Sequence, residues 1–73
     1  MIVDELAKHR RETLVLKHME WLTIRHTYAI RVDRVNDVPE WRSAAREAGR
    51  RLKISVRTGV SRDGTLVWAS EGP

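Results

Sequence analysis

Hydrophobic positions in the first part of the chain recur at the spacing of a helix. Asp4 and Glu5 stand at its beginning, where the positive pole of a helix dipole stabilises acidic side chains. We therefore predict a helix over residues 3–18. Residues 13–16 (Thr-Leu-Val-Leu) are also typical of a strand, so a short helix followed by a strand is the alternative. At 100° per residue, one apolar arc of the helix holds Val3, Leu6, Ala7 and Leu14.

Residues 21–33 alternate between hydrophobic and polar side chains, which is the period of a strand buried on one face. The pattern predicts a strand over this whole segment. His26 takes an inward position in the series, so we expect it to be a hydrogen-bonded core residue. The other inward positions are Leu22, Ile24, Tyr28, Ile30 and Val32.

A second helix is predicted to begin at Asp37. The Asp37 side chain can cap the helix, Glu40 follows three residues later as in a capping box, and Pro39 is tolerated in the first turn. Gly49 either ends this helix or lies inside it, where close packing requires a small residue. The apolar face holds Trp41, Ala44, Ala45, Ala48 and Leu52. A basic face about a third of a turn away holds Arg42, Arg46, Arg50 and Lys53.

The C-terminal part is predicted to be a β-hairpin of two strands, residues 52–60 and 65–69. Asp63 and Gly64 lie between these alternating segments and are typical of a two-residue turn in which both central residues have positive φ. In the register that this turn predicts, Trp68 covers a glycine on one face of the hairpin. The register pairs Val60 with Val67, Gly59 with Trp68 and Thr58 with Ala69, and it places Arg57 diagonal to Trp68.

These elements follow the order helix, strand, helix, strand, strand. A single-layer sheet of about three strands, antiparallel or mixed, would be covered by the two helices, because each element must bury its apolar face. The predicted fold class is therefore α+β. The 73 residues allow one domain, at 1–70, and from Ser70 the chain is expected to fray into a flexible tail at 71–73. A chain this short buries only about 60% of its unfolded surface, so its core is marginal.

The net charge of +4 comes from the end of the sequence. Residues 1–20 carry four basic and four acidic side chains, and residues 21–40 carry three of each. Residues 41–73 carry seven basic side chains against three acidic ones. Eleven of the fourteen basic residues are arginines, which suit two-point contacts with phosphates or carboxylates. Codon usage in a GC-rich genome would explain the share of arginine, but it would not explain the clustering.

The basic region predicts nucleic-acid binding. Cations one helical turn apart can contact successive phosphates and release their counterions. DNA is slightly favoured over RNA because a basic helix can enter a groove, and Trp68 could stack on a base if it is exposed. The predicted binding residues are Arg42, Arg46, Arg50, Arg51, Lys53, Arg57, Arg62 and Trp68.

Two other interpretations of the basic region stay open. The arginines could be a solvated helix face whose long stems cover apolar surface. Alternatively, the chain is a protein-interaction module of the phage, plasmid or toxin–antitoxin type that binds an acidic protein partner, or it forms a homodimer. Tryptophan and arginine are enriched at protein interfaces, which supports this second interpretation.

No catalytic, metal or cofactor site is predicted. The chain has no cysteine, and the spacing of His9, His18 and His26 matches no usual zinc site. No glycine-rich phosphate loop or nucleophile elbow is present in the sequence. An RNase-type site near Tyr28, with His26 as the base and Arg25 on the phosphate, is a weaker alternative.

The hydrophobic runs predict no membrane association. Acidic residues stand at positions 4 and 5, where a secretory signal would have basic and apolar residues. The longest purely apolar run, residues 66–69, is far shorter than a membrane span. We therefore expect a cytoplasmic protein.

Overall fold

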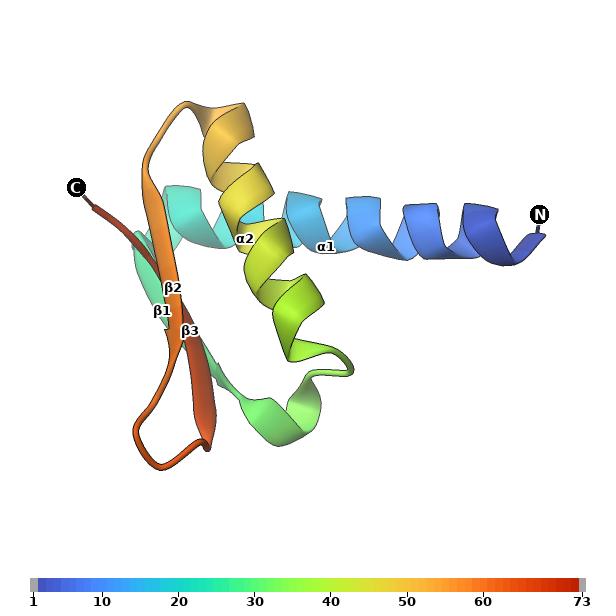
Figure 1. The fold of residues 1–73 in the computed structure, drawn as a ribbon. Helices are drawn as coiled ribbons and strands as arrows, with labels where there is room; N and C mark the ends of the chain where they lie inside the picture. Colours follow the sequence, from blue (N-terminus) through green and yellow to red (C-terminus); the bar gives the residue numbers. More distant parts are fainter. Residues whose placement is uncertain (1, 73) are drawn as a thin grey trace.

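Within residues 2–72, the part of the chain that the computed structural model describes, there are two α-helices, a short 3₁₀ helix and three strands (Figure 1). Side chains are described from Leu6 onward, so the expectations for Val3, Asp4 and Glu5 lie outside the described residues. The predicted α+β class and the order of helices and strands are confirmed. The elements are α1 (Ile2–Arg25), β1 (Thr27–Arg31), η1 (Val32–Arg34), α2 (Val38–Leu52), β2 (Val56–Val60) and β3 (Leu66–Glu71).

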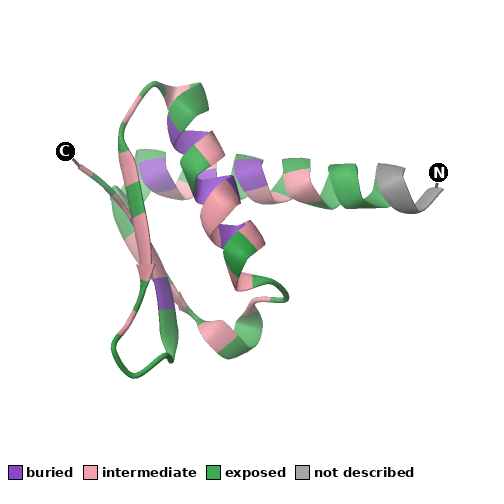
Figure 2. Ribbon diagram, in the orientation of Figure 1, coloured by how far each residue is buried: buried purple, intermediate pink, exposed green. Residues whose placement is uncertain are grey.

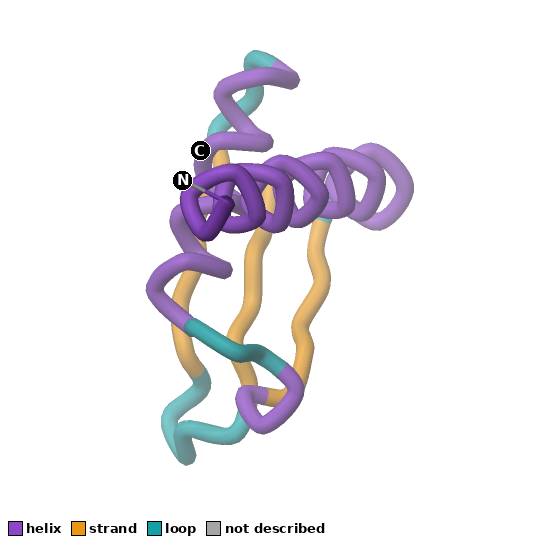
Figure 3. The backbone as a smooth tube through the Cα atoms, turned by 90° about the vertical axis from the view of Figure 1, so that its right-hand side faces the viewer, coloured by secondary structure: helices purple, strands orange, loops and turns teal. Residues whose placement is uncertain are grey.

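The strands form one antiparallel sheet in the order β1-β3-β2, so the last strand of the chain lies in the middle. Both helices lie on the same side of this sheet (Figure 1, Figure 3). Helix α2 packs on β2 and β3, and α1 crosses α2. The N-terminal half of α1 projects away from the rest of the fold (Figure 1). None of the described elements covers the other side of the sheet.

The core lies on the sheet-facing side of α2 and where α1 crosses it (Figure 2). The alanines of α2 keep its buried face small, which lets both the sheet and α1 approach closely. Trp41 is the large residue of this face, and it is buried as the sequence predicted. One group of buried residues, at the helix crossing, is Val15, Leu22, Ala44 and Ala48. The other, between α2 and the sheet, is Trp41, Ala45, Val67 and Ala69.

The first helix is longer than predicted, because α1 continues to Arg25 rather than ending at residue 18. Val15, His18 and Leu22 are buried and lie three and four residues apart, so they share one helical face that packs on α2. The prediction of a strand over residues 21–33 is therefore wrong for its first six residues, and it is also wrong for its last two, which belong to η1. The strand alternative for residues 13–16 is wrong as well. Leu6, assigned to the apolar arc, is 57% exposed on the projecting half of α1.

His26 is not the core residue that the alternation predicted. It joins α1 to β1 with a φ of 63°, and its side chain is 68% exposed. Ile24, also predicted to point inward, is exposed on the last turn of α1. The buried histidine is His18. The strand prediction failed because helical and strand patterns of hydrophobic residues overlap over a few residues. The extensive contact of α1 with α2 stabilises the helix here.

The predicted start of α2 is confirmed. The Asp37 side chain accepts a hydrogen bond from the Glu40 backbone N–H at 3.0 Å, and Pro39 lies in the first turn. Gly49 lies inside the helix rather than at its end, and a Cβ there would overlap the side chain of Val56. The helix ends at Lys53, which adopts the left-handed conformation with φ 60°. Residues 52–55 are therefore not part of the second strand.

The predicted hairpin register is confirmed, with Val60 paired to Val67 and Trp68 opposite a glycine. The turn itself is longer than the predicted two-residue loop. Gly64 has a φ of 77°, but Asp63 does not have positive φ. The Gly64 N–H donates to the Ser61 carbonyl at 2.9 Å, and Asp63 uses its side chain instead. Its carboxylate accepts from the Ser61 hydroxyl at 2.7 Å and from the Thr65 hydroxyl and N–H at 2.7 and 3.1 Å.

The end of the chain is more ordered than the predicted tail. Ser70 and Glu71 belong to β3, and the Glu71 N–H donates to the His26 carbonyl at 2.7 Å. The Gly72 N–H donates to the Ser55 carbonyl at 3.1 Å. The prediction that the chain frays from Ser70 is therefore wrong, because backbone hydrogen bonds to both neighbouring segments hold these residues. Pro73 lies outside the described residues.

Candidate nucleic-acid interface

Three arginines lie one helical turn apart along the side of α2 that borders β2. They are Arg42, Arg46 and Arg50, and they are called the arginine row below. The guanidinium of Arg42 donates to the Thr58 hydroxyl at 2.8 Å and to the Thr58 carbonyl at 3.3 Å. Arg46 reaches the same hydroxyl at 3.4 Å. Arg46 and Arg50 are exposed. Where side chains are described, none of the three forms an ion pair, so the row presents uncompensated positive charge.

The row lies along the open edge of the sheet. The Ser61 N–H bonds to the Leu66 carbonyl of β3, so by alternation the polar backbone groups of Thr58 are directed away from β3. Arg42 supplies a donor to that otherwise exposed carbonyl. A charged side chain over an edge strand also discourages pairing with another chain. Arg42 therefore has a structural role as well, whereas Arg46 and Arg50 are the more available cations of the row.

Arg51 does not join the row. Its guanidinium bonds to both carboxylate oxygens of Glu12, at 2.7 and 2.8 Å, and to Glu47 at 2.8 Å. Arg11 bonds to Glu47 at 2.9 Å and to the Ser43 hydroxyl at 3.1 Å. The hydrogen bond from Arg51 lowers the pKa of Glu12, and bonds from Arg11 and then Arg51 lower the pKa of Glu47. This network links α1 to α2 and neutralises Arg51.

Lys53 and Arg62 lie beyond the two ends of β2. Lys53 is exposed at the C-terminal cap of α2, one turn after Arg50. Arg62 is exposed in the loop between β2 and β3. Together with the arginine row they spread positive charge along this edge of the molecule.

Arg57 and Trp68 lie on the side of the sheet that faces away from α2. Trp68 is half-buried, and a Cβ on Gly59 would lie 2.6 Å from its Cζ2 atom, so the indole covers this glycine as predicted. Arg57 pairs with Ser70, on the same face of the sheet as Trp68. Apart from Arg51, which contacts α1, the predicted site residues thus lie on two surfaces that meet at β2.

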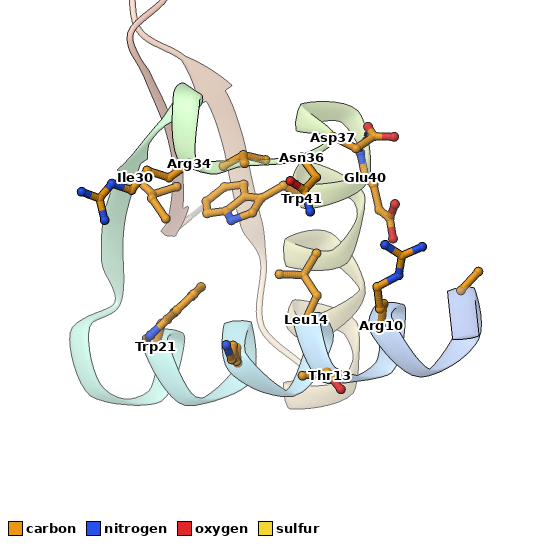
Figure 4. A pocket seen from close by; sticks show the side chains of 13 residues that line it. Arg10, Thr13, Leu14, Trp21, Ile30, Arg34, Asn36, Asp37, Glu40 and Trp41 are labelled. Carbon is orange, nitrogen blue, oxygen red and sulfur yellow. Dashed lines mark hydrogen bonds between the residues drawn. The ribbon is translucent and has the colours of Figure 1, made fainter. Parts of the chain in front are cut away.

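A groove of about 620 Å³ lies between α1, η1 and the beginning of α2 (Figure 4). Apolar side chains including Leu14, Trp21 and Trp41 line it, and the Arg10 and Glu40 side chains point toward each other at its rim (Figure 4). Sequence analysis missed this groove, because it depends on the angle at which α1 crosses the fold. Its lining mixes charges of both signs, with Arg10, Lys17 and Arg34 as well as Asp37 and Glu40, so it is less suited to a polyanion than the arginine row.

His18 is fully buried beside this groove. Its Nδ1 atom is hydrogen-bonded to the Tyr28 hydroxyl, and its ring centroid lies 4.4 Å from that of Trp41 and 5.4 Å from that of Trp21. Burial lowers the pKa of His18 to about 4, although a backbone contact with Trp41 opposes the shift. Burial also raises the pKa of the Tyr28 hydroxyl. His18 is therefore neutral near pH 7 and belongs to the core.

The structure separates Tyr28 from His26, two residues of the weaker RNase-type alternative. Tyr28 points to the inner side of the sheet and bonds to His18, whereas His26 is exposed and bonds to Glu71 at 2.8 Å. The three histidines are also separated, because His9 lies on the projecting half of α1. Among residues with described side chains, no group of three or more metal-binding residues converges.

Comparisons of the chain with protein-family models, curated proteins and solved structures give no significant match. Within residues 2–72, no helix is long and apolar enough to cross a membrane.

Proposed function

We propose that this chain binds nucleic acid through the phosphate backbone, with the arginine row as the centre of the interface. The observation that carries the proposal is the contrast within α2. Arg51 is neutralised by Glu12 and Glu47, whereas Arg46 and Arg50 are exposed one turn apart without a carboxylate partner among the described residues. Adjacent turns of the row rise about 6 Å along the helix, so each cation can contact a different phosphate.

Binding of this kind is driven by the release of counterions from the phosphates. It depends little on base sequence, because phosphate contacts position a protein without identifying the bases. An accessory or regulatory role fits such binding better than recognition of one sequence. Duplex DNA is the first probe, because Arg46 and Arg50 lie on the solvent side of a helix that could lie along a groove.

A direct binding titration tests the proposal. The chain is added to fluorescently labelled duplex DNA, and separately to RNA of the same sequence, at low salt, and anisotropy is measured. Half-saturation is expected at or below about 1–100 µM, the usual range of non-specific binding at physiological salt, because low salt strengthens such binding. If neither nucleic acid binds at the upper end of that range, the proposal fails.

A protein-binding module is the second candidate, and the groove of Figure 4 favours it. Grooves at interfaces are anchored by buried aromatic and basic residues, and this groove offers Trp21 and Trp41 beside Arg10, Lys17 and Arg34. A protein that co-purifies with the chain after nuclease treatment would support this candidate. If nuclease treatment removes the co-purifying protein, the association instead depends on nucleic acid.

A further inference from the structure

The outer side of the sheet carries a half-buried aromatic ring over which no helix or strand of residues 2–72 lies. Both helices lie on the opposite side, and Figure 1 and Figure 3 show no element over this one. Trp68 lies at the middle of the central strand β3, with Gly59 of β2 and Ala29 of β1 as its cross-strand neighbours. The side chains that alternation directs outward are Thr27, Ala29, Arg31, Arg57, Gly59, Leu66, Trp68 and Ser70.

The glycine at position 59 determines how the indole lies. A Cβ there would be 2.6 Å from Cζ2 and 2.8 Å from Cε2 of Trp68, which is closer than real side chains approach. The ring therefore rests on the backbone of β2 instead of standing up from the sheet. Gly59 does not have positive φ, so its backbone conformation does not explain the glycine. Because the neighbours on both sides are small, the outer surface of the ring stays accessible.

A hollow of about 410 Å³ opens beside this ring. Arg57 and Ser70 line it from adjacent strands, and Glu71 and Gly72 close its end. The Glu71 carboxylate is hydrogen-bonded to His26 Nδ1 at 2.8 Å.

We propose that this face of the sheet binds single-stranded nucleic acid, with one base stacked on Trp68 and a neighbouring phosphate at Arg57. The inference rests on the proposed function and narrows it. An aromatic ring on an open surface stacks on any base, because every base has a π-face. In a duplex the base faces are hidden within the stack, so only an unpaired base can reach a ring that lies flat on a sheet. The arginine row, on the other side of β2, would contact the strand's backbone as it passes the sheet edge.

Binding of single strands and duplexes by matched variants tests this inference. The probes are labelled oligo-dT, oligo-U and a duplex of the same length. Trp68→Leu is expected to weaken binding of both single strands about tenfold or more and to leave duplex binding unchanged. Gly59→Ala is expected to act in the same direction, because its Cβ displaces the ring. Leu66→Ala, on the same face, is the control and should change neither single-strand binding nor duplex binding.

The outcomes separate this inference from the proposed function. If Trp68→Leu binds single strands as tightly as the natural chain does, while binding still depends on Arg46 and Arg50, the sheet-face site is wrong and the proposed function stands. If none of the probes binds, both are wrong. Circular dichroism of each variant shows whether it is folded. If Trp68→Leu unfolds, two other measurements decide: binding by Gly59→Ala, and quenching of the tryptophan fluorescence of the natural chain by oligo-dT. The absence of quenching would overturn the inference.

Discussion

Arg51 and Glu12, 39 positions apart in the sequence, are joined by two parallel hydrogen bonds of 2.7 and 2.8 Å. The pair connects α2 to α1 and turns an arginine of the basic cluster into a structural residue. The same helix therefore carries two kinds of arginine. Arg51, which faces α1, is paired with carboxylates, and the three that border β2 form the arginine row.

Replacing Arg51 should separate these two roles. Arg51→Ala is expected to lower the midpoint of thermal unfolding modestly, and the difference should shrink in high salt because the exposed ion pair is screened. Arg51→Lys should recover only part of the loss, because lysine cannot make the two-point contact. Binding of nucleic acid should change little. A larger loss of binding for Arg51→Ala than for Arg46→Ala would contradict the assignment of Arg51 to the helix contact.

The buried His18 predicts how stability depends on pH. An unfolded histidine has a pKa near 6.5, whereas that of His18 in the fold is about 4, so the unfolded chain binds the proton first as the pH falls. The stability that neutral His18 contributes to the fold is complete above pH 6.5 and is lost as the pH falls from 6.5 toward 4. The loss should amount to about 3 kcal/mol over that interval. Urea unfolding at pH 7 and pH 4.5 measures most of this loss.

The exposed His9 provides the control for this pH effect. His9→Gln should keep the full pH dependence, because that side chain lies on the projecting half of α1. Hydrogen bonds from arginine lower the pKa values of Glu12 and Glu47, so the stability that these carboxylates contribute is present above pH 4.5 and is lost mainly below it. Equal stability at pH 7 and pH 4.5 would show that His18 is not buried in its neutral form.

Gly49→Ala should destabilise the fold even though alanine favours helix. The added Cβ would overlap the Val56 side chain and lie 3.1 Å from the Ile54 carbonyl. Overpacking of this kind costs about 1–3 kcal/mol, which exceeds the gain of about 1 kcal/mol in helix propensity. The double variant Gly49→Ala/Val56→Ala should recover part of that loss relative to the sum of the single changes. A more stable Gly49→Ala chain would refute the close packing of α2 on β2.

Gly64 tests the hairpin turn. Its φ of 77° is unfavourable for other residues, and nothing lies within 4 Å of the position of an added Cβ. Gly64→Ala should therefore cost about 1–2 kcal/mol through the backbone alone. Gly72→Ala is the matched control, since that position is equally open but does not have positive φ, and it should be nearly neutral. Chemical denaturation of the two variants compares them directly, and equal stabilities would contradict the turn geometry.

The second half of the chain was predictable from sequence because its determinants are local. Asp37 caps a helix three residues before Glu40, and the loop around Gly64 fixes a register in which Trp68 meets Gly59. The first half of the chain was less predictable from sequence. The alternation that contains Leu22 fits a strand as well as a helix, and only packing against α2 decides between them.

The candidate site was predictable only as a set of residues. Charge clustering identified the arginines, but it could not separate Arg51 from Arg46, because the partner Glu12 comes from a distant helix. The groove beside Trp21 and Trp41 carried no local pattern at all. Sequence spacing also could not place Trp68 and the arginine row on opposite sides of β2, since that depends on which face of the sheet α2 covers.

The salt dependence of binding tests the central claim most directly. The affinity for duplex DNA is measured at several salt concentrations for the natural chain, for Arg46→Ala/Arg50→Ala, and for Lys8→Ala/Arg10→Ala, which removes the same charge from the projecting half of α1. Each lost phosphate contact lowers the slope of log affinity against log salt by about 0.9. The row variant should therefore lose about two units of slope relative to the natural chain, and the control should lose none. Equal slopes for the two variants would contradict the arginine row as the interface.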